Sequence, residues 1–305
     1  MEATSSRLGR VLVTGATGFL GSAVVRTLRS MDADVVGLSR RPAPTENPHV
    51  CLDLTQNDVA EVIQRHSITT IIHCAGAIGE PRDAGSWADC LAQHLTATDR
   101  LLTASLAQRE PPRVVVTSSA AIYAPLEDGQ HSADEAHPWR PSGRYGVAKA
   151  AATMLAQLEV QRGSPVAIGI PFNVIGPGQP PALVPQTFIS QLQRDPDRLV
   201  VGDLTPIRDW VDVRDVARAL VLLADPDCPT GRFNICTGRG QSVGMILERL
   251  LAVSGHAPKV SERSHLAPSA GVSRSVGNPS LLYASTGWEP AYSLDTSLKA
   301  MLRFP

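Results

Sequence analysis

Tyr145 and Lys149 are the residues whose types and spacing point most directly to chemistry. They stand four positions apart in RYGVAKAAATML, a stretch of helical character, so both side chains are expected on one helix face about a turn apart. The chain has four tyrosines and three lysines, and random placement would give only about 0.04 such pairs. An ammonium beside a phenol lowers a pKa that is otherwise about 10. Tyr145 is therefore predicted to exchange a proton with a substrate oxygen near neutral pH.

The elements that must position this pair form a regular alternation along the first half of the chain. Short apolar runs rich in β-branched residues alternate with helical patterns from residue 10 to about 172; the runs are RVLVTG, DVVGLS, HVCLDL, TTIIHCAG, RVVVTSS and VAIGIPFN. Parallel strands need crossover connections, and these cover both faces of a sheet. The predicted fold class is therefore α/β, a doubly wound parallel sheet of the Rossmann type.

The character of the chain changes after Pro171. The stretch PFNVIGPGQPPALVPQ is rich in proline and glycine, and mixed short elements follow it. We therefore expect a dinucleotide-binding domain over residues 1–172 and a smaller C-terminal substrate-binding lobe over residues 173–305. Part of 208–236 is expected to return to the first domain.

Three glycines mark the expected nucleotide end of the fold. Gly15, Gly18 and Gly21 follow the first strand at a spacing of three and lead into the helical pattern SAVVRTLR. Glycine permits a tight turn there and lets backbone N–H groups and a helix N-terminus approach a pyrophosphate. Because the motif lies between a first strand and a first helix, it predicts a dinucleotide site.

The end of the second strand bears on which dinucleotide binds. An acidic residue there would hold the ribose 2′-hydroxyl of NAD, but VVGLSRR has Ser39 followed by Arg40 and Arg41. A hydroxyl and a guanidinium suit a 2′-phosphate, so NADP(H) is predicted as the preferred cofactor and NAD(H) as the alternative. The two arginines could instead form a solvated turn. Asp53, after the third strand, is expected to accept a hydrogen bond from the adenine amino group, or else to cap the pattern TQNDVAEVIQ.

Composition narrows the class of partner. The hydrophobic fraction of 43% is enough for a sizeable core. The net charge is -1 and the sequence has no long Lys/Arg run, so it shows no basic surface for nucleic acid or an anionic membrane, and small-molecule partners are favoured. The first ten residues lack the apolar stretch of a signal peptide, and no window has the roughly 18 apolar residues of a membrane helix. The five cysteines show no paired spacing and are expected to be buried thiols, without disulfides or a metal, in a reducing cytoplasm.

Together these motifs resemble a known family. The glycine motif, HCAG at 73–76, Ser119, the Tyr145–Lys149 pair and PFNVIGPGQ look like the extended short-chain dehydrogenase/reductases, the sugar-nucleotide epimerase, dehydratase and reductase group. The resemblance covers the chain from residue 10 to about residue 288. It implies that Ser119 hydrogen-bonds the substrate oxygen, that Tyr145 is the acid/base, that Lys149 also holds the nicotinamide ribose, and that Asn173 faces the substrate.

The expected contacts follow from these motifs and from the resemblance. The cofactor is expected to contact Gly15, Thr17, Gly18, Phe19, Leu20, Gly21, Ser39, Arg40, Arg41, Asp53, Leu54, Ala75, Gly76, Tyr145, Lys149 and Pro171. The substrate is expected to contact Ser119, Ala120, Asn173 and Arg208.

Within this group the sequence favours reduction over dehydration. Family members that eliminate water carry an Asp-Glu pair directly after the active-site hydroxyl residue, whereas this chain has Ala120 and Ala121. The segment VVGDLTPIRDWVDVRDVARAL looks most like the GDP-4-keto-6-deoxymannose reductases and related deoxysugar ketoreductases. That likeness implies that Arg208 pairs with a substrate diphosphate; the alternative is an ion pair with Asp209, Asp212 or Asp215.

Several positions depart from the family pattern. His94 stands where the family usually has an asparagine, and it could relay protons or simply pack within its helix. The distal arginine that often completes diphosphate binding has only Arg263 and Arg274 as candidates. The remaining departures are Gly143-Arg144 before the tyrosine, Ile122-Tyr123-Ala124 after the serine motif, and Ile170 in place of the usual arginine.

The sequence therefore predicts an NADPH-dependent ketoreductase that acts on a nucleotide-linked 4-keto-6-deoxyhexose. The alternatives are a 4-epimerase that retains NAD, a reductase of a non-nucleotide natural-product ketone, and a cofactor-sensing binding module. A homodimer formed through helices at 88–108 and 144–161 is also expected from the resemblance.

Overall fold

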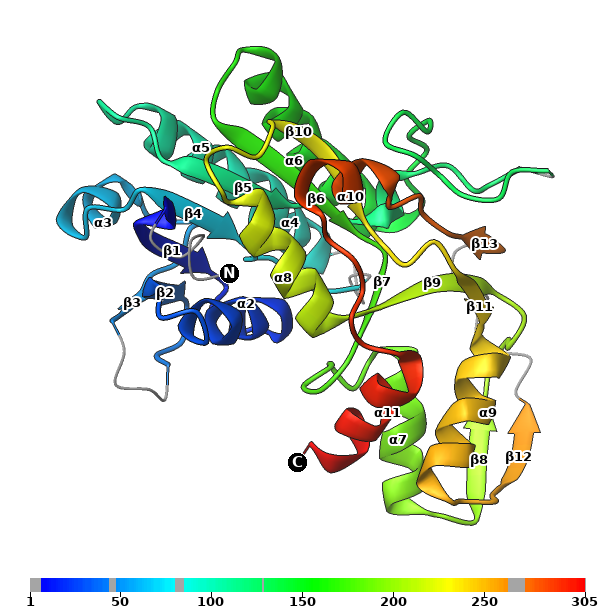
Figure 1. Ribbon diagram of the computed structural model, residues 1–305. Coiled ribbons are helices and arrows are strands. Elements are labelled where there is room, and N and C mark those ends of the chain that lie inside the picture. The colour runs from blue at the N-terminus through cyan, green and yellow to red at the C-terminus, as the bar shows by residue number, and fades with distance from the viewer. Residues whose placement is uncertain (1–6, 44–47, 80–84, 128, 263–271, 305) are drawn as a thin grey trace.

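A seven-stranded parallel sheet forms the centre of the molecule (Figure 1). The computed structural model describes residues 7–43, 48–79, 85–127, 129–262 and 272–304 of the chain. The strand order is β10-β6-β5-β4-β1-β2-β3. Its strands are β1 (Arg10–Thr14), β2 (Asp34–Ser39), β3 (His49–Cys51), β4 (Thr70–His73), β5 (Arg113–Thr117), β6 (Val166–Pro171) and β10 (Gly231–Ile235). The order reverses between β1 and β4, so a crevice is expected at their carboxyl ends.

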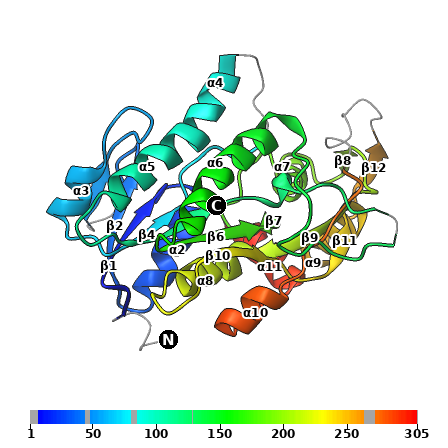
Figure 2. The ribbon, with the colours of Figure 1, turned by 90° about the horizontal axis from the view of Figure 1, so that it is seen from above.

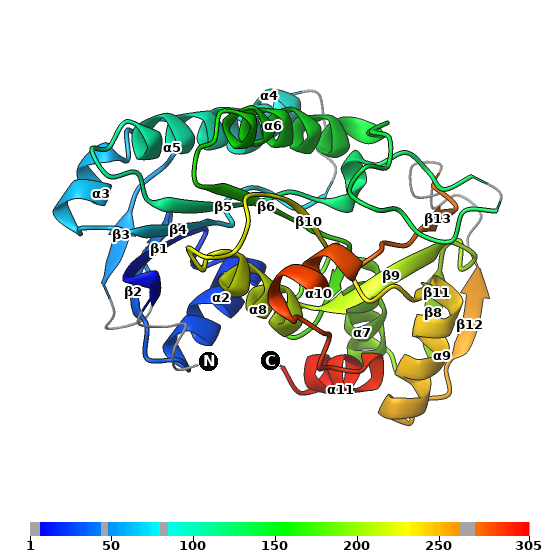
Figure 3. The ribbon, with the colours of Figure 1, turned by 45° about the horizontal axis from the view of Figure 1, so that its top comes forward.

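Helices cover both faces of this sheet (Figure 3). One face carries α2 (Phe19–Arg29), α8 (Val213–Leu223) and α10 (Ser280–Thr286). The other carries α3 (Ala60–Arg65), α4 (Gly85–Leu91), the π-helix η1 (Ala92–Thr96), α5 (Ala97–Leu106) and α6 (Gly143–Gln161). Seen from above, α4, η1 and α5 form one long rod beside α6 (Figure 2). The predicted doubly wound fold class is thus confirmed.

The sheet is buried on both faces because the middle positions of its strands are mostly apolar. In β1, Val11 and Val13 pack with α2 and α8, whereas Leu12 packs toward α3 and α5. Successive strand residues point to opposite faces, so an apolar run without polar alternation supplies both cores at once. The apolar runs found in the sequence therefore correspond to the central strands.

A smaller group of elements packs beside the carboxyl end of the sheet (Figure 1). It contains β7 (Asn173–Ile175), α7 (Val184–Arg194), β8 (Arg198–Val201), β9 (Ile207–Asp212), β11 (Gly240–Ser242), α9 (Val243–Ser254), β12 (Lys259–Glu262), β13 (Arg274–Ser275) and α11 (Leu294–Arg303). β9 pairs with β7, β11 and β13, while β8 pairs with β12. A separate apolar core formed by α7, α9 and α11 holds these elements together. Between β7 and β12 the chain returns once to the large sheet, as α8 and β10.

Three local expectations were wrong. The helix expected to begin in TQNDVAEVIQ starts only at Ala60, after Asp58 accepts a hydrogen bond from the Ala60 N–H. The first helix starts at Phe19, three residues earlier than the apolar pattern suggested. All five cysteines are free thiols, but Cys51 is exposed at the edge strand β3 and Cys74 is only partly buried.

Across the described ranges, every helix is too short or too polar to cross a membrane.

Candidate active site

The glycine turn after β1 is shaped by close backbone approach. Gly15 has a φ of +67°, and its carbonyl oxygen accepts a hydrogen bond of 2.8 Å from the Gly18 N–H. A Cβ on Gly21 would overlap that same carbonyl. α2 begins at Phe19 without any side-chain cap from Gly18, so its first N–H groups are available to an anion. This backbone arrangement fits the pyrophosphate of a dinucleotide.

A first cavity, the nucleotide cavity, lies where the loops after β1, β2, β3 and β4 meet. Its volume is about 290 Å³. The predicted cofactor residues that line it are Gly15, Thr17, Gly18, Ser39, Arg40, Arg41, Asp53, Leu54, Ala75 and Gly76. Residues 93 and 97, from η1 and α5, close it from the helical side and were not foreseen.

The loop that carries the two arginines is held by its neighbours. The Ser39 hydroxyl donates to the Arg41 carbonyl at 2.6 Å and lies 3.0 Å from Nε2 of His49. The Cys51 thiol donates to the Arg40 carbonyl at 3.2 Å. The Ser39 hydroxyl therefore donates its hydrogen bond to the loop backbone. The guanidinium groups of Arg40 and Arg41 are the cationic donors at this end of the cavity.

Asp53 closes a turn at the floor of the same cavity. Its Oδ1 accepts hydrogen bonds from the Thr55 N–H at 2.9 Å and the Thr55 hydroxyl at 2.8 Å. These bonds lower the pKa of the carboxyl, and Arg40 adds to the effect. The turn ends well before α3, so Asp53 does not cap that helix.

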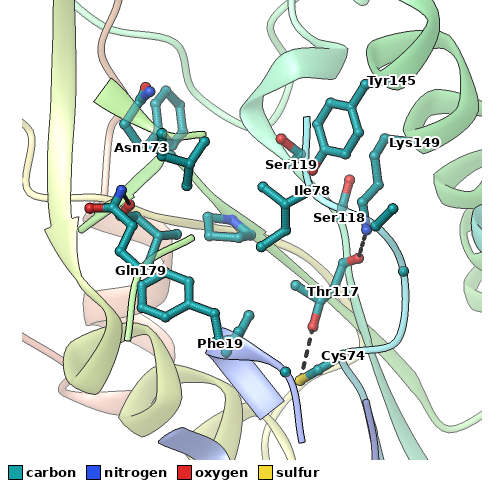
Figure 4. A pocket seen from close by; sticks show the side chains of 18 of the residues that line it. Phe19, Cys74, Ile78, Thr117, Ser118, Ser119, Tyr145, Lys149, Asn173 and Gln179 are labelled. Carbon is teal, nitrogen blue, oxygen red and sulfur yellow. Dashed lines mark hydrogen bonds between the residues drawn. The ribbon is translucent and has the colours of Figure 1, made fainter. Parts of the chain in front are cut away.

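A second cavity, the catalytic cavity, continues from the first across Gly18 and Gly76. Its volume is about 310 Å³. The predicted residues that line it are Gly18, Phe19, Leu20, Gly21, Gly76, Ser119, Tyr145, Lys149, Pro171 and Asn173. Figure 4 shows Tyr145, Ser119 and Lys149 together on one wall, with Asn173 and Gln179 on the opposite wall.

Lys149 is held deep in the catalytic wall. Its ammonium donates to the carbonyl of Thr117 at 2.9 Å, at the end of β5. Burial lowers the pKa of Lys149 to about 8. The spacing of four places Lys149 one turn below Tyr145 on α6, and both side chains reach the cavity.

Ser119 sits at the start of a short 3₁₀ turn, η2 (Ala120–Ile122). Its Oγ accepts a hydrogen bond of 3.2 Å from the Ala121 N–H. Because a hydroxyl has one donor and two acceptor sites, this bond leaves the Ser119 O–H able to donate to a ligand oxygen.

A third cavity, the adjoining cavity, opens on the far side of Tyr145. Its volume is about 340 Å³. The predicted residues that line it are Ser119, Ala120, Tyr145, Asn173 and Arg208. Ser119, Tyr145 and Asn173 therefore stand at the junction of two cavities, and every predicted site residue lines one of the three.

Arg208 is fixed by backbone carbonyls at the edge of the adjoining cavity. Its guanidinium donates to Ile207 and to Val272, each at 2.8 Å, and burial lowers its pKa. Its acidic neighbours bond elsewhere: Asp212 with Arg214, Asp215 with Arg218, and Asp209 with Thr237 and Gly238. The ion-pair alternative for Arg208 is not supported by where these carboxylates lie.

Arg274 enters the adjoining cavity beside Arg208. One of its terminal nitrogens lies 3.4 Å from the His131 carbonyl, and its buried Nε has no hydrogen-bond partner in the described protein. Arg263, the other candidate for a distal arginine, lies outside the described residues. The cavity thus brings together two guanidinium groups that are 66 residues apart in sequence.

His94 packs edge-on against the ring of Tyr145, with ring centroids 5.5 Å apart. It lies in the π-helix η1 and is almost fully buried. Burial, helped by the positive charge of Lys149, lowers the pKa of His94 to about 3. A group with this pKa is neutral near pH 7 and is a poor proton carrier there.

Some lining residues were missed in the sequence. In the catalytic cavity they are Ile78, Gln179, Leu183, Val184 and Trp210, and in the adjoining cavity Tyr123, Val272 and Val276. Gln179 ends the motif PFNVIGPGQ, which could have marked it. Ile78 and Tyr123 come from loops after β4 and η2, the others come from the smaller group, and no local pattern brings them to the site.

Comparison with known proteins agrees with this geometry. Residues 11–236 match the model of the NAD dependent epimerase/dehydratase family. GDP-6-deoxy-D-mannose reductase from Pseudomonas aeruginosa is 28% identical over 299 residues, which is 96% of this chain and 96% of that protein. The structure of MoeE5 in complex with UDP-glucose and NAD has a TM-score of 0.85 at 31% identity and covers 96% of this chain and 97% of that one.

A second solved structure, RMD from Pseudomonas aeruginosa complexed with NADPH, has a TM-score of 0.82 at 27% identity, covering 96% of this chain and 97% of that chain. The family match spans the glycine turn, Ser119 after β5, and the tyrosine and lysine of α6. The chain therefore belongs to the NAD dependent epimerase/dehydratase family of extended short-chain dehydrogenase/reductases and is an oxidoreductase that uses a nicotinamide cofactor.

Proposed function

We propose that this protein uses NADPH to reduce the keto group of a nucleotide-linked 4-keto-6-deoxyhexose. The observation that carries the proposal is the position of Ser119 and Tyr145 at the junction of two cavities. The cavity on one side contains the expected cofactor residues, and the one on the other side contains two arginines. The similarity to GDP-6-deoxy-D-mannose reductase, a protein whose name describes this kind of substrate, also supports it.

The chemistry divides between two hydrogen-bond donors. The Ser119 hydroxyl holds the substrate oxygen, and the Tyr145 phenol donates its proton to that oxygen as negative charge develops. When bound, the reduced nicotinamide supplies the hydride. The Lys149 ammonium, fixed by the Thr117 carbonyl, favours the phenolate that remains, because an adjacent positive charge stabilises it.

The two arginines after β2 support a preference for NADP(H). Arg40 and Arg41 both line the nucleotide cavity, and a 2′-phosphate gains charge-assisted hydrogen bonds from a guanidinium. An acidic residue at the end of β2 would disfavour this phosphate, and Ser39 stands there instead.

The residues next to Ser119 argue against water elimination. Ala120 and Ala121 line the adjoining cavity where dehydrating relatives have an acidic pair. Elimination of water needs a general acid and a general base of its own. The methyl groups of Ala120 and Ala121 supply neither. Ser119 and Tyr145 are then the hydrogen-bond donors to the substrate oxygen at the junction, which suits hydride transfer to a carbonyl.

Arg208 and Arg274 would bind the diphosphate of the nucleotide sugar. Both guanidinium groups line the adjoining cavity, and a guanidinium fork matches phosphate geometry. Arg208 is held in place by backbone carbonyls, whereas the buried Nε of Arg274 has no hydrogen-bond partner in the described protein, so its guanidinium is less firmly fixed.

We further propose a homodimer formed through α5 and α6. The outer face of α6 exposes Val147, Met154 and Leu158, with exposed fractions of 43%, 62% and 42%. Burial of such side chains between two copies is favourable by about 25 cal/mol per Å² of apolar surface. Sedimentation of the purified protein checks the dimer, and a monomer at micromolar concentration would contradict it.

The free thiols suit a reducing compartment, so the cytoplasm is the proposed location.

The deciding experiment is NADPH oxidation, followed by absorbance, with GDP- and dTDP-4-keto-6-deoxyhexoses offered in parallel. Turnover with one of them that disappears in Tyr145→Phe supports the reductase and identifies the nucleotide. If both fail while NADPH still binds, the substrate lies outside nucleotide sugars. If the protein is purified with bound NAD and interconverts hexose epimers without NADPH, the reductase proposal is replaced by a 4-epimerase.

A further inference from the structure

His94 lies between the cofactor groove and the proposed catalytic tyrosine. On one side its ring stands 5.5 Å from that of Tyr145, with the two planes 79° apart. On the other side it meets Gly76, where an added Cβ would come within 2.6 Å of Nδ1. Gly76 lines both the nucleotide cavity and the catalytic cavity. One side chain thus touches the groove floor and the acid/base ring.

The polar atoms of His94 are buried without a well-formed hydrogen bond. Its exposed fraction is 2%, and neither ring nitrogen makes a well-formed hydrogen bond in the described chain, although the backbone of Ala77 lies close enough to interact with the ring. Nearby His73 is just as buried, but its nitrogens lie 2.7 Å from the Thr14 hydroxyl and 3.2 Å from the Thr98 hydroxyl. A buried polar atom without a partner destabilises the fold, so a phenyl ring of similar size would suit packing better.

The helix around His94 is distorted at the same place. Residues 92–96 form a π-helix between α4 and α5. Such a bulge inserts one extra residue into a helical turn and frequently occurs at functional sites. The bulge brings His94 from the rod of α4, η1 and α5 toward Gly76 and Tyr145.

The groups around His94 favour its neutral form. Lys149 and His73 face it from α6 and β4, and both disfavour a second positive charge, while the Ala77 backbone weakly favours one. A neutral imidazole has one N–H donor and one acceptor nitrogen. In a site with little water, a fixed dipole of this kind interacts strongly with charge that develops beside it.

We propose that His94 is a positioning residue that fills the space between the groove floor at Gly76 and the Tyr145 ring, holds that ring in place and stabilises the phenolate through its ring dipole. The inference rests on the proposed role of Tyr145 as acid/base. It explains why a polar ring occupies a position that packing alone would assign to an apolar one. It also links the floor of the cofactor groove to the orientation of the phenol.

The test compares His94→Phe, which keeps the ring and removes the nitrogens, with His94→Gln, which keeps polar atoms and loses the ring. Three quantities are measured in the full chain: the thermal midpoint, the NADPH dissociation constant, and the Tyr145 phenol titration with NADP⁺ bound. The titration is taken from the ultraviolet difference against Tyr145→Phe. His137→Phe is the matched control, because His137 also packs edge-on to a tyrosine, Tyr123.

We expect His94→Phe to melt higher than the parent and to bind NADPH within twofold of it. We expect its phenol to titrate about one pH unit higher and its kcat to fall about tenfold, because the dipole is gone. We expect His94→Gln to lose stability and to recover part of the phenol shift. His137→Phe should leave the phenol titration unchanged.

An unchanged phenol titration and an unchanged kcat in His94→Phe would overturn the proposal and leave His94 as packing. The titration needs no substrate, so it tests His94 even if no sugar nucleotide is turned over. If Tyr145→Phe retains parental activity, the proposed function itself fails, whatever the His94 variants show.

Discussion

The cofactor side and the substrate side of Tyr145 differ in how their polar groups are satisfied. On the cofactor side, protein atoms already supply the partners. His73 bonds to two threonine hydroxyls, Ser39 to the Arg41 carbonyl, Asp53 to Thr55, and Lys149 to the Thr117 carbonyl. The nucleotide end of the site is therefore built before any ligand arrives.

On the substrate side, the Nε of Arg274 in the adjoining cavity is buried without a hydrogen-bond partner within the described protein. Oε1 of Gln179, which lines the catalytic cavity, is buried without a partner as well. Forming such a missing bond with a ligand is favourable, because a buried polar atom without a partner is costly. In this protein, therefore, the polar groups of the cofactor end are largely satisfied by the protein itself, whereas Arg274 at the substrate end is not.

The largest expected effect is on the catalytic rate of Tyr145→Phe, and comparing that rate with NADPH affinity separates the chemical step from cofactor binding. Tyr145→Phe should lower kcat for ketone reduction by about 10³-fold, because the proton donor is lost. NADPH affinity should stay within twofold, since the cofactor side is complete without the hydroxyl. Steady-state rates and fluorescence titration with NADPH measure the two quantities. A large loss of NADPH affinity would show that the two sides are not separable.

The pH dependence of the free energy of unfolding tests the two buried histidines, His73 and His94, together. The pKa values of His73 and His94 are each about 3 in the folded chain, against about 6.5 when unfolded. The contribution of these two groups to the free energy of unfolding is therefore complete above pH 6.5 and is lost as the pH drops toward 3, by about 2.7 kcal/mol per pH unit for the two together. Urea unfolding from pH 7 to pH 4 measures this slope.

His94→Phe sharpens the same comparison. It removes one of the two groups, so the slope should fall by about 1.4 kcal/mol per pH unit. If the slope does not change, the acid sensitivity does not come from His94.

Cofactor choice tests the nucleotide end. Arg40→Ala should weaken NADPH about tenfold or more and leave NADH unchanged, because one charge-assisted bond to the 2′-phosphate is lost. The KM for the sugar nucleotide should stay constant, since the arginine lies far along the groove from the junction. Arg41→Ala is the matched variant that shows which guanidinium carries the effect. Equal losses for NADH and NADPH would contradict a phosphate contact.

The smallest expected effect lies on the substrate side. Arg274→Gln should raise the KM for the sugar nucleotide about fivefold, by removing one charged partner of the diphosphate. NADPH binding should not change. Arg232→Gln serves as control, because Arg232 lies over the Trp139 ring and outside the three cavities. Equal KM values in Arg274→Gln and the parent would remove Arg274 from the substrate site.

Much of the cofactor end could be predicted because its signals are local. The order strand, glycine turn and helix is contiguous in sequence, and so is the helical pair Tyr145 and Lys149. The apolar runs gave the strands, since strands buried on both faces need no polar alternation. The start of α3 was misjudged because the polar residues of TQND resemble a first helical turn in sequence, although the helix begins only at Ala60.

The substrate end was harder to read for a physical reason. Ile78, Leu183 and Trp210 reach the catalytic cavity from three different loops and strands, and no periodicity connects them. The hydrogen bonds of Arg208 to the 272–273 carbonyls likewise join β9 to a segment more than sixty residues away. Contacts of this kind depend on how the smaller group of elements docks against the sheet.

From the sequence alone came the fold class, through the alternation of apolar runs with helical patterns, and the glycine turn and the Tyr145–Lys149 pair, because their spacing is local; Ser119 came from the family resemblance. Tertiary structure decided that Ser119 and Tyr145 share a junction between two cavities, that the Ser39 hydroxyl bonds within its own loop, and that His94 packs against Tyr145. Neighbouring residues are fixed by local backbone geometry, whereas distant ones meet only when apolar faces bury one another and bring their loops together.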